Sequence, residues 1–144
     1  MSTVSTPIRM TPWHLWVTAI LTLLWNGSGA YTIMMAQAGR LPDVDAEEAV
    51  YYAAQPLWFV FATDIALLLP LAAGVALLLR SRMAVWLFAL SLIALVVNNG
   101  YDVAAGTSLM LDDRGWPMVT TIVAVIAVLQ LTYAWAMKKR AVLQ

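Results

Sequence analysis

The sequence contains no cysteine and one histidine, and charged residues make up only 11% of its 144 residues. Without cysteine the chain can form no disulfide bond, thiolate metal site or cysteine nucleophile. His14 has no cysteine or carboxylate at ligand spacing, so it does not make a metal site by count. Eight acidic and eight basic residues give a net charge of zero, whereas phosphate binding needs concentrated Lys and Arg. Because no catalytic or cofactor motif stands out either, we expect no enzyme, no cofactor and no nucleic-acid partner.

Long apolar runs dominate the sequence instead. Hydrophobic residues make up 62% of the chain, against about 45–50% in soluble domains. Four runs cover residues 13–37, 56–79, 83–103 and 116–137. Each has about the 20 residues that a helix needs to cross a bilayer, where backbone groups must bond within their own segment. The sequence therefore predicts an all-α fold, with one transmembrane domain over residues 1–144 built as an up-down-up-down four-helix bundle.

The charges between the runs predict the orientation of the spans. Arg80 and Arg82 flank the second connection, and residues 138–140 form a basic cluster after the fourth run, whereas the other two connections are acidic overall. Basic loops stay in the cytoplasm, so we expect both termini there. The first run lacks a convincing signal-peptide cleavage site, so we expect it to be retained as a span.

The first connection is the longest and contains a candidate helix. Leu41-Pro42-Asp43 resembles a helix start, and residues 45–54 are good helix formers that end before Gln55-Pro56. A short interfacial helix would hold Tyr51 and Tyr52 at headgroup depth. A bare linker is the alternative.

A weak internal repeat relates the two halves of the chain. Trp25-Asn26-Gly27 lies near the outer end of the first run, and Asn98-Asn99-Gly100 lies near that of the third. In both halves an acidic loop, a proline, another apolar run and a basic stop follow. Two interpretations stay open: parallel-related helical hairpins, as in some transporters, or chance similarity between generic hairpins.

Polar groups at membrane depth are the candidate functional residues. Asp64 lies about 12 Å along the second span, with no basic residue in the spans to neutralise it. If the bundle is compact, a ligand-binding or proton-binding cluster could form in its outer half from Asp64, Asn26, Asn98, Asn99 and Asp102. Asn and Ser inside spans also bond neighbouring helices, so a purely structural polar cluster is the alternative.

Three further polar residues suggest packing rather than chemistry. His14 stands between Trp13 and Trp16 near the inner rim, which is typical of an interfacial anchor. Gln130 and Tyr133, in the inner half of the fourth run, are expected to make bonds between helices.

Small residues predict where helices approach closely. Gly27, Gly29 and Ala30 flatten the first run, and the second run contains Ala72, Ala73, Gly74 and Ala76. Such faces let helix backbones come close together.

Several motifs in the first two thirds of the chain resemble a known group. They are Pro12-Trp13-His14-Leu15-Trp16, Leu24-Trp25-Asn26 with Gly29-Ala30, Pro56-Leu57-Trp58, and Leu77-Leu78-Leu79-Arg80-Ser81-Arg82 with Ala84 and Ser91. The pattern is similar to the DoxX-like group of small four-helix inner-membrane proteins of proteobacteria, often labelled sugar transporters without support. An Asp-Tyr pair usually follows Gly29-Ala30 in that group, but here Tyr31, Thr32 and Ile33 follow. The resemblance implies a bacterial inner (plasma) membrane location and leaves any role of the missing acid in doubt.

Three functions fit these features. The first is transport or binding of a small-molecule ligand through the outer polar cluster, in a homo-oligomer. The second is a non-catalytic accessory or scaffold subunit of a larger membrane complex. The third, an oxidoreductase partner in the manner of DoxX, would need a cofactor site for which no motif appears.

Overall fold

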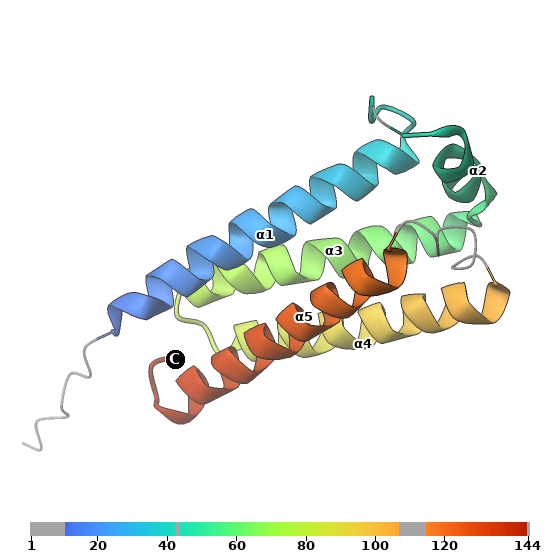
Figure 1. Cartoon of the computed structure of the whole chain (residues 1–144). Helices are drawn as coiled ribbons and strands as arrows, with labels where there is room; N and C mark the ends of the chain where they lie inside the picture. The colour runs from blue at the N-terminus through green and yellow to red at the C-terminus, as the bar shows by residue number, and fades with distance from the viewer. Residues whose placement is uncertain (1–10, 43, 107–114, 144) are drawn as a thin grey trace, which may run out of the picture.

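The structure, a computed structural model, describes residues 11–42, 44–106 and 115–143, which form five α-helices and contain no strand (Figure 1). The helices are α1 Trp13–Gln37, α2 Ala46–Ala54, α3 Leu57–Leu78, α4 Met83–Ala105 and α5 Trp116–Lys139. The all-α prediction is confirmed. The bounds of the four long helices lie within two residues of the predicted apolar runs, because prolines, glycines and charges delimit those runs.

The predicted short helix in the first connection is present as α2, but it begins later than the motif suggested. Asp45, rather than Asp43, is its N-cap, and the Asp45 carboxylate accepts hydrogen bonds from the backbone N–H groups of Glu47 and Glu48, each at 3.0 Å. These bonds satisfy backbone donors that have no partner within the helix. The negative charges of the two glutamates in the first turn interact favourably with the positive, N-terminal end of the helix dipole. Asp43 itself lies outside the described residues.

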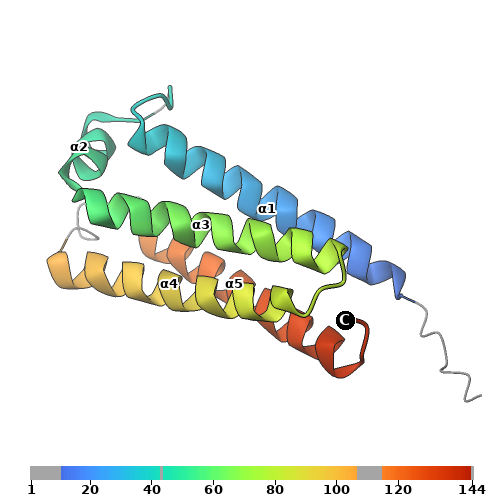
Figure 2. The ribbon, with the colours of Figure 1, turned by 180° about the vertical axis from the view of Figure 1, so that it is seen from behind.

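The helix α3 occupies the middle of the molecule. It packs against α1 on one side and α4 on the other, while α5 packs against α4 and α2 lies against α1. Figures 1 and 2 show the four long helices side by side, with α2 at one end. We call this the α2 end, and the opposite end, with the turn between α3 and α4, the basic end. The helices α1 and α5 are the two edges of this arrangement. The side of the molecule between α1 and α5 is therefore not covered by another helix.

The close approach of α1 and α3 depends on one glycine. Gly74 of α3 faces α1, and a Cβ at this position would lie 2.8 Å from Leu23 Cδ2 and 3.3 Å from Thr22 Cγ2. Gly29, by contrast, has no atom within 4 Å of such a Cβ. The predicted close contact is therefore made at Gly74 of the second run, and Gly29 of the first run has no part in it.

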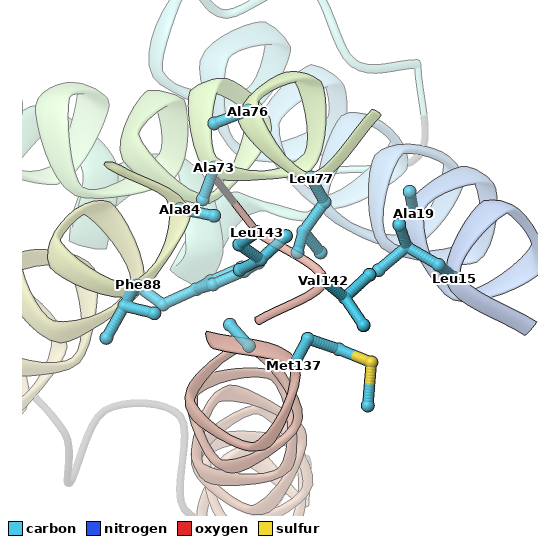
Figure 3. Close-up of a cluster of buried hydrophobic side chains, with 12 residues drawn as sticks. Leu15, Ala19, Ala73, Ala76, Leu77, Ala84, Phe88, Met137, Val142 and Leu143 are labelled. Atoms are coloured by element: carbon cyan, nitrogen blue, oxygen red, sulfur yellow. The ribbon is translucent and has the colours of Figure 1, made fainter. Parts of the chain in front are cut away.

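The hydrophobic core lies at the basic end, where the chain after α5 folds back (Figure 3). Ala141 has a left-handed backbone (φ 55°), which turns Val142 and Leu143 into the core between α1, α3 and α4. Nε of Arg80 donates to the Val142 carbonyl at 3.2 Å, and Nε of Arg82 donates to the Leu143 carbonyl at 3.3 Å. Arg80 and Arg82, in the turn at the basic end, thus also hold the end of the described chain.

Three helices, α3, α4 and α5, are long and apolar enough to cross a membrane. The helix α1, with 25 residues, is as long, but it is not among these three. Large apolar side chains are exposed on all four long helices, among them Ile20, Leu24, Phe61, Ile65, Trp86, Ile93, Val125 and Leu129. Soluble monomers rarely expose apolar surface on this scale, so the molecule suits a lipid environment.

Candidate ligand and proton site

Asp102, near the end of α4, lies under α2. Its carboxylate oxygens accept from the Tyr51 hydroxyl at 3.1 and 3.3 Å, and both residues are buried. The Tyr51 ring meets Tyr52 and Trp116 edge to face, with ring centroids 5.1 and 6.0 Å apart. The short helix is thereby attached to the ends of α4 and α5. Nothing in the sequence paired Tyr51 with Asp102, because 51 positions separate them and only packing brings them together.

This attachment depends on the protonated form of Tyr51. Burial, followed by the negative charge of Asp102, raises the pKa of Tyr51. A raised pKa means that the neutral hydroxyl favours the folded state, so its stabilisation is present below the usual tyrosine pKa of about 10 and is lost as the pH rises beyond it.

Replacing Tyr51 by Phe is expected to destabilise the protein in detergent by about 1–3 kcal/mol, because a buried carboxylate loses a donor. The change should also reduce the loss of stability at alkaline pH. Tyr52→Phe is the matched control, since burial and then Glu48 raise the pKa of Tyr52 but no hydroxyl bond to Asp102 would be lost. The measurement is the free energy of unfolding against pH, and equal losses in the two variants would contradict the assignment.

Asp64 lies in the half of α3 nearer the α2 end. It precedes Leu71 by two helical turns and so shares its face, and Leu71 packs beside Gly27 of α1. The Asp64 side chain is therefore on the face of α3 that is turned toward α1. Its Oδ1 is buried and accepts no hydrogen bond from the described residues. A buried carboxylate oxygen without a donor is costly, and such an acid in an apolar helix is a candidate for binding a proton or a ligand.

The seam between α3 and α4 also contains polar groups. Nδ2 of Asn98 donates to Thr63 Oγ1 at 3.4 Å, and the Ser91 hydroxyl donates to the Ala66 carbonyl at 3.4 Å. Thr63 immediately precedes Asp64, so the structure brings Asn98 to the residue next to the acid.

The other two amides bond within their own helices. Nδ2 of Asn26 donates to the Thr22 carbonyl, and Nδ2 of Asn99 donates to the Leu95 carbonyl, each at 2.8 Å. Asn99 lines a groove of about 360 Å³ between α4 and α5. Of the five residues that the sequence singled out, Asn26 thus stays within α1 and Asp64 lies on the α1 face of α3. The other three, all on α4, lie at separate places: Asn98 in the seam with α3, Asn99 in this groove, and Asp102 at the attachment of α2.

A larger cleft, which the sequence did not indicate, opens between α1 and α5. Its volume is about 640 Å³, and its walls are mainly apolar. It is lined by Thr18, Leu21, Thr22 and Trp25 from α1, and by Ile126, Leu129, Gln130, Thr132, Tyr133 and Ala136 from α5. The cleft exists because α1 packs against α3 and α5 packs against α4.

Tyr133 of α5 and His14 of α1 meet at the basic end of this cleft. Nδ1 of His14 lies 2.6 Å from the Tyr133 hydroxyl, and the two rings meet edge to face with centroids 5.8 Å apart. The expectation that Tyr133 bonds between helices is confirmed. His14 therefore also links α1 to α5 at this end of the molecule.

Among the described residues, no group of three or more His, Cys, Asp or Glu side chains could hold a metal ion. No protein-family model matches the chain, and comparison with curated proteins and with solved structures finds no match. The candidate site therefore has to be argued from its own geometry.

Proposed function

We propose that this chain is an integral membrane protein whose four long helices all cross the bilayer, and that it transports protons, alone or with a small ligand, past Asp64. It acts as a homo-oligomer, because four helices rarely enclose a path by themselves. Its place is the bacterial inner membrane, as the resemblance to small DoxX-like proteins implies.

The surface of α1 supports the fourth crossing. The helix has 25 residues, more than any of the other three long helices, and it exposes Ile20, Leu21 and Leu24. Since α1 packs along α3, a crossing by α3 takes α1 through the same layer. Three polar side chains of α1, those of Asn26, Ser28 and Thr32, donate to the backbone of their own helix.

The charge distribution supports the orientation. Arg80, Arg82 and residues 138–140 gather at the basic end, whereas Asp45, Glu47 and Glu48 lie at the α2 end. Basic residues next to spans favour the cytoplasm, so the basic end and both chain termini lie there.

One observation carries the functional part of the proposal, namely the buried Asp64 Oδ1 that accepts no hydrogen bond from the described residues. Asp102 differs, because Tyr51 donates to both of its oxygens. An acid without a donor at membrane depth is satisfied when a proton, a water molecule or a ligand reaches it. Asp64 is thus the acid of the predicted cluster that a transported species would use.

An accessory role in a larger complex is the second candidate, and the exposure of α5 favours it. Only 6% of the most apolar stretch of α5 is buried inside the molecule, against 28% for α3 and for α4. A partner helix packed on α5 would cover that surface.

Proton uptake by phospholipid vesicles separates the two candidates. The purified protein is reconstituted with a pH-sensitive dye inside, and a potassium gradient with valinomycin makes the interior negative. We expect faster internal acidification than in protein-free vesicles. Equal rates would contradict the transport proposal and favour the accessory role.

A further inference from the structure

We propose that the cleft between α1 and α5 binds one anionic phospholipid from the leaflet at the basic end, with an acyl chain along the cleft and the phosphate beside Lys139 and Arg140. The inference rests on the membrane placement in the proposed function, but not on Asp64 or on transport.

The dimensions of the cleft fit one leaflet. Its lining on α5 runs from Ile126 to Ala136, which is about 15 Å at the rise of an α-helix. Half of a hydrocarbon core of roughly 30 Å has the same length. The cleft lies toward the basic end, where His14 and Tyr133 join across it. Its volume of about 640 Å³ falls within the range of ligand pockets, which is about 300–1,000 Å³.

The residues beyond the cleft supply charge of one sign. Lys139 lies on the same face of α5 as Thr132 and Ala136, which line the cleft. Its ammonium group lies 3.5 Å from the centre of the Trp135 ring, and tryptophan marks the depth of lipid headgroups. Arg140 follows at the helix end, close enough for its charge to act on Tyr133. An apolar cleft with two cations beyond its end fits an anionic lipid better than a neutral one.

The neighbouring lysine provides a matched control. Lys138 is turned toward α4, with its ammonium group 5.7 Å from the centre of the Trp86 ring. It lies next to Lys139 in the helix and carries the same charge, but it does not lie on the face of α5 that lines the cleft.

The test is native mass spectrometry of the detergent-purified protein with added dioleoyl phosphatidylglycerol or dioleoyl phosphatidylcholine. We expect one phosphatidylglycerol to be retained in preference to phosphatidylcholine. Lys139→Gln should weaken that retention about fivefold, as expected for one basic residue at an anionic headgroup, while Lys138→Gln leaves it unchanged. Equal losses in the two variants would show diffuse attraction to the basic end and would overturn the proposal.

A second pair of variants tests whether the lipid lies in the cleft. Leu129→Trp places bulk in the cleft and should abolish retention, whereas Ile65→Trp, on the exposed surface of α3, should not. If Leu129→Trp instead converts a dimer into a monomer, the cleft is an interface between two copies and the lipid proposal is wrong. Lipid retention is read without any proton flux, so its failure and the failure of the transport proposal are distinguishable.

Discussion

Asp64→Asn is expected to reduce proton uptake to the rate of protein-free vesicles. The substitution preserves the size and shape of the side chain, but an amide cannot take up and release a proton. Because Oδ1 of Asp64 accepts no hydrogen bond from the described residues, no bond to them is lost at that oxygen. The variant should therefore keep the helical content of the wild type while it loses activity.

Asp102→Asn is the matched control for this result. Both acids lie in long apolar helices, but Asp102 accepts from Tyr51, and an amide oxygen can still accept that hydrogen bond. Uptake should continue in this variant. Unchanged uptake in Asp64→Asn, or equal loss in both variants, would remove Asp64 from the transport path.

Gly74→Ile is expected to separate α1 from α3. The first added carbon would lie 2.8 Å from Leu23 Cδ2 and 3.0 Å from Leu23 Cγ, and isoleucine adds further atoms beyond it. Overpacking of this kind costs about 1–3 kcal/mol. Gly74→Ala should cost less, because the end of the Leu23 side chain can rotate away.

Gly29→Ile is the control for the packing argument. A Cβ at Gly29 meets no atom within 4 Å, so the free energy of unfolding should change by no more than about 0.5 kcal/mol. Unfolding in mixed detergent and dodecyl sulfate measures both variants. Equal losses of unfolding free energy in Gly74→Ile and Gly29→Ile would mean that both substitutions act only through the helix backbone. The packing of α1 on α3 would then not depend on Gly74.

The sequence predicted the helices well because each boundary has a local cause. Pro12 and Pro56 precede α1 and α3, Gly106 ends α4 in a left-handed conformation, and Lys139 is the last residue of α5. The start of α2 was misplaced because Asp43 and Asp45 both offer capping side chains, and the structure uses the one followed by two glutamates.

The sequence could not predict which helices are neighbours. Apolar residues lie on every side of the long helices, so no stripe marks the face that turns inward. The contacts of Tyr51 with Asp102 and of His14 with Tyr133 join residues 51 and 119 positions apart, and they follow from packing alone. The five polar residues are not gathered, because α1 packs against α3, and Asn26 and Asn99 bond to the backbone of their own helices.

Four crossings are the premise on which the transport path and the lipid site both depend, and labelling of single cysteines tests them most directly. The chain has no cysteine of its own, so Thr11→Cys, Val50→Cys and Met83→Cys can each be read without background. With a membrane-impermeant maleimide on intact bacterial cells, we expect Val50→Cys to react, and Thr11→Cys and Met83→Cys to react only after permeabilisation. Reaction of Thr11→Cys from outside, together with Val50→Cys, would show that α1 does not cross and would contradict the account.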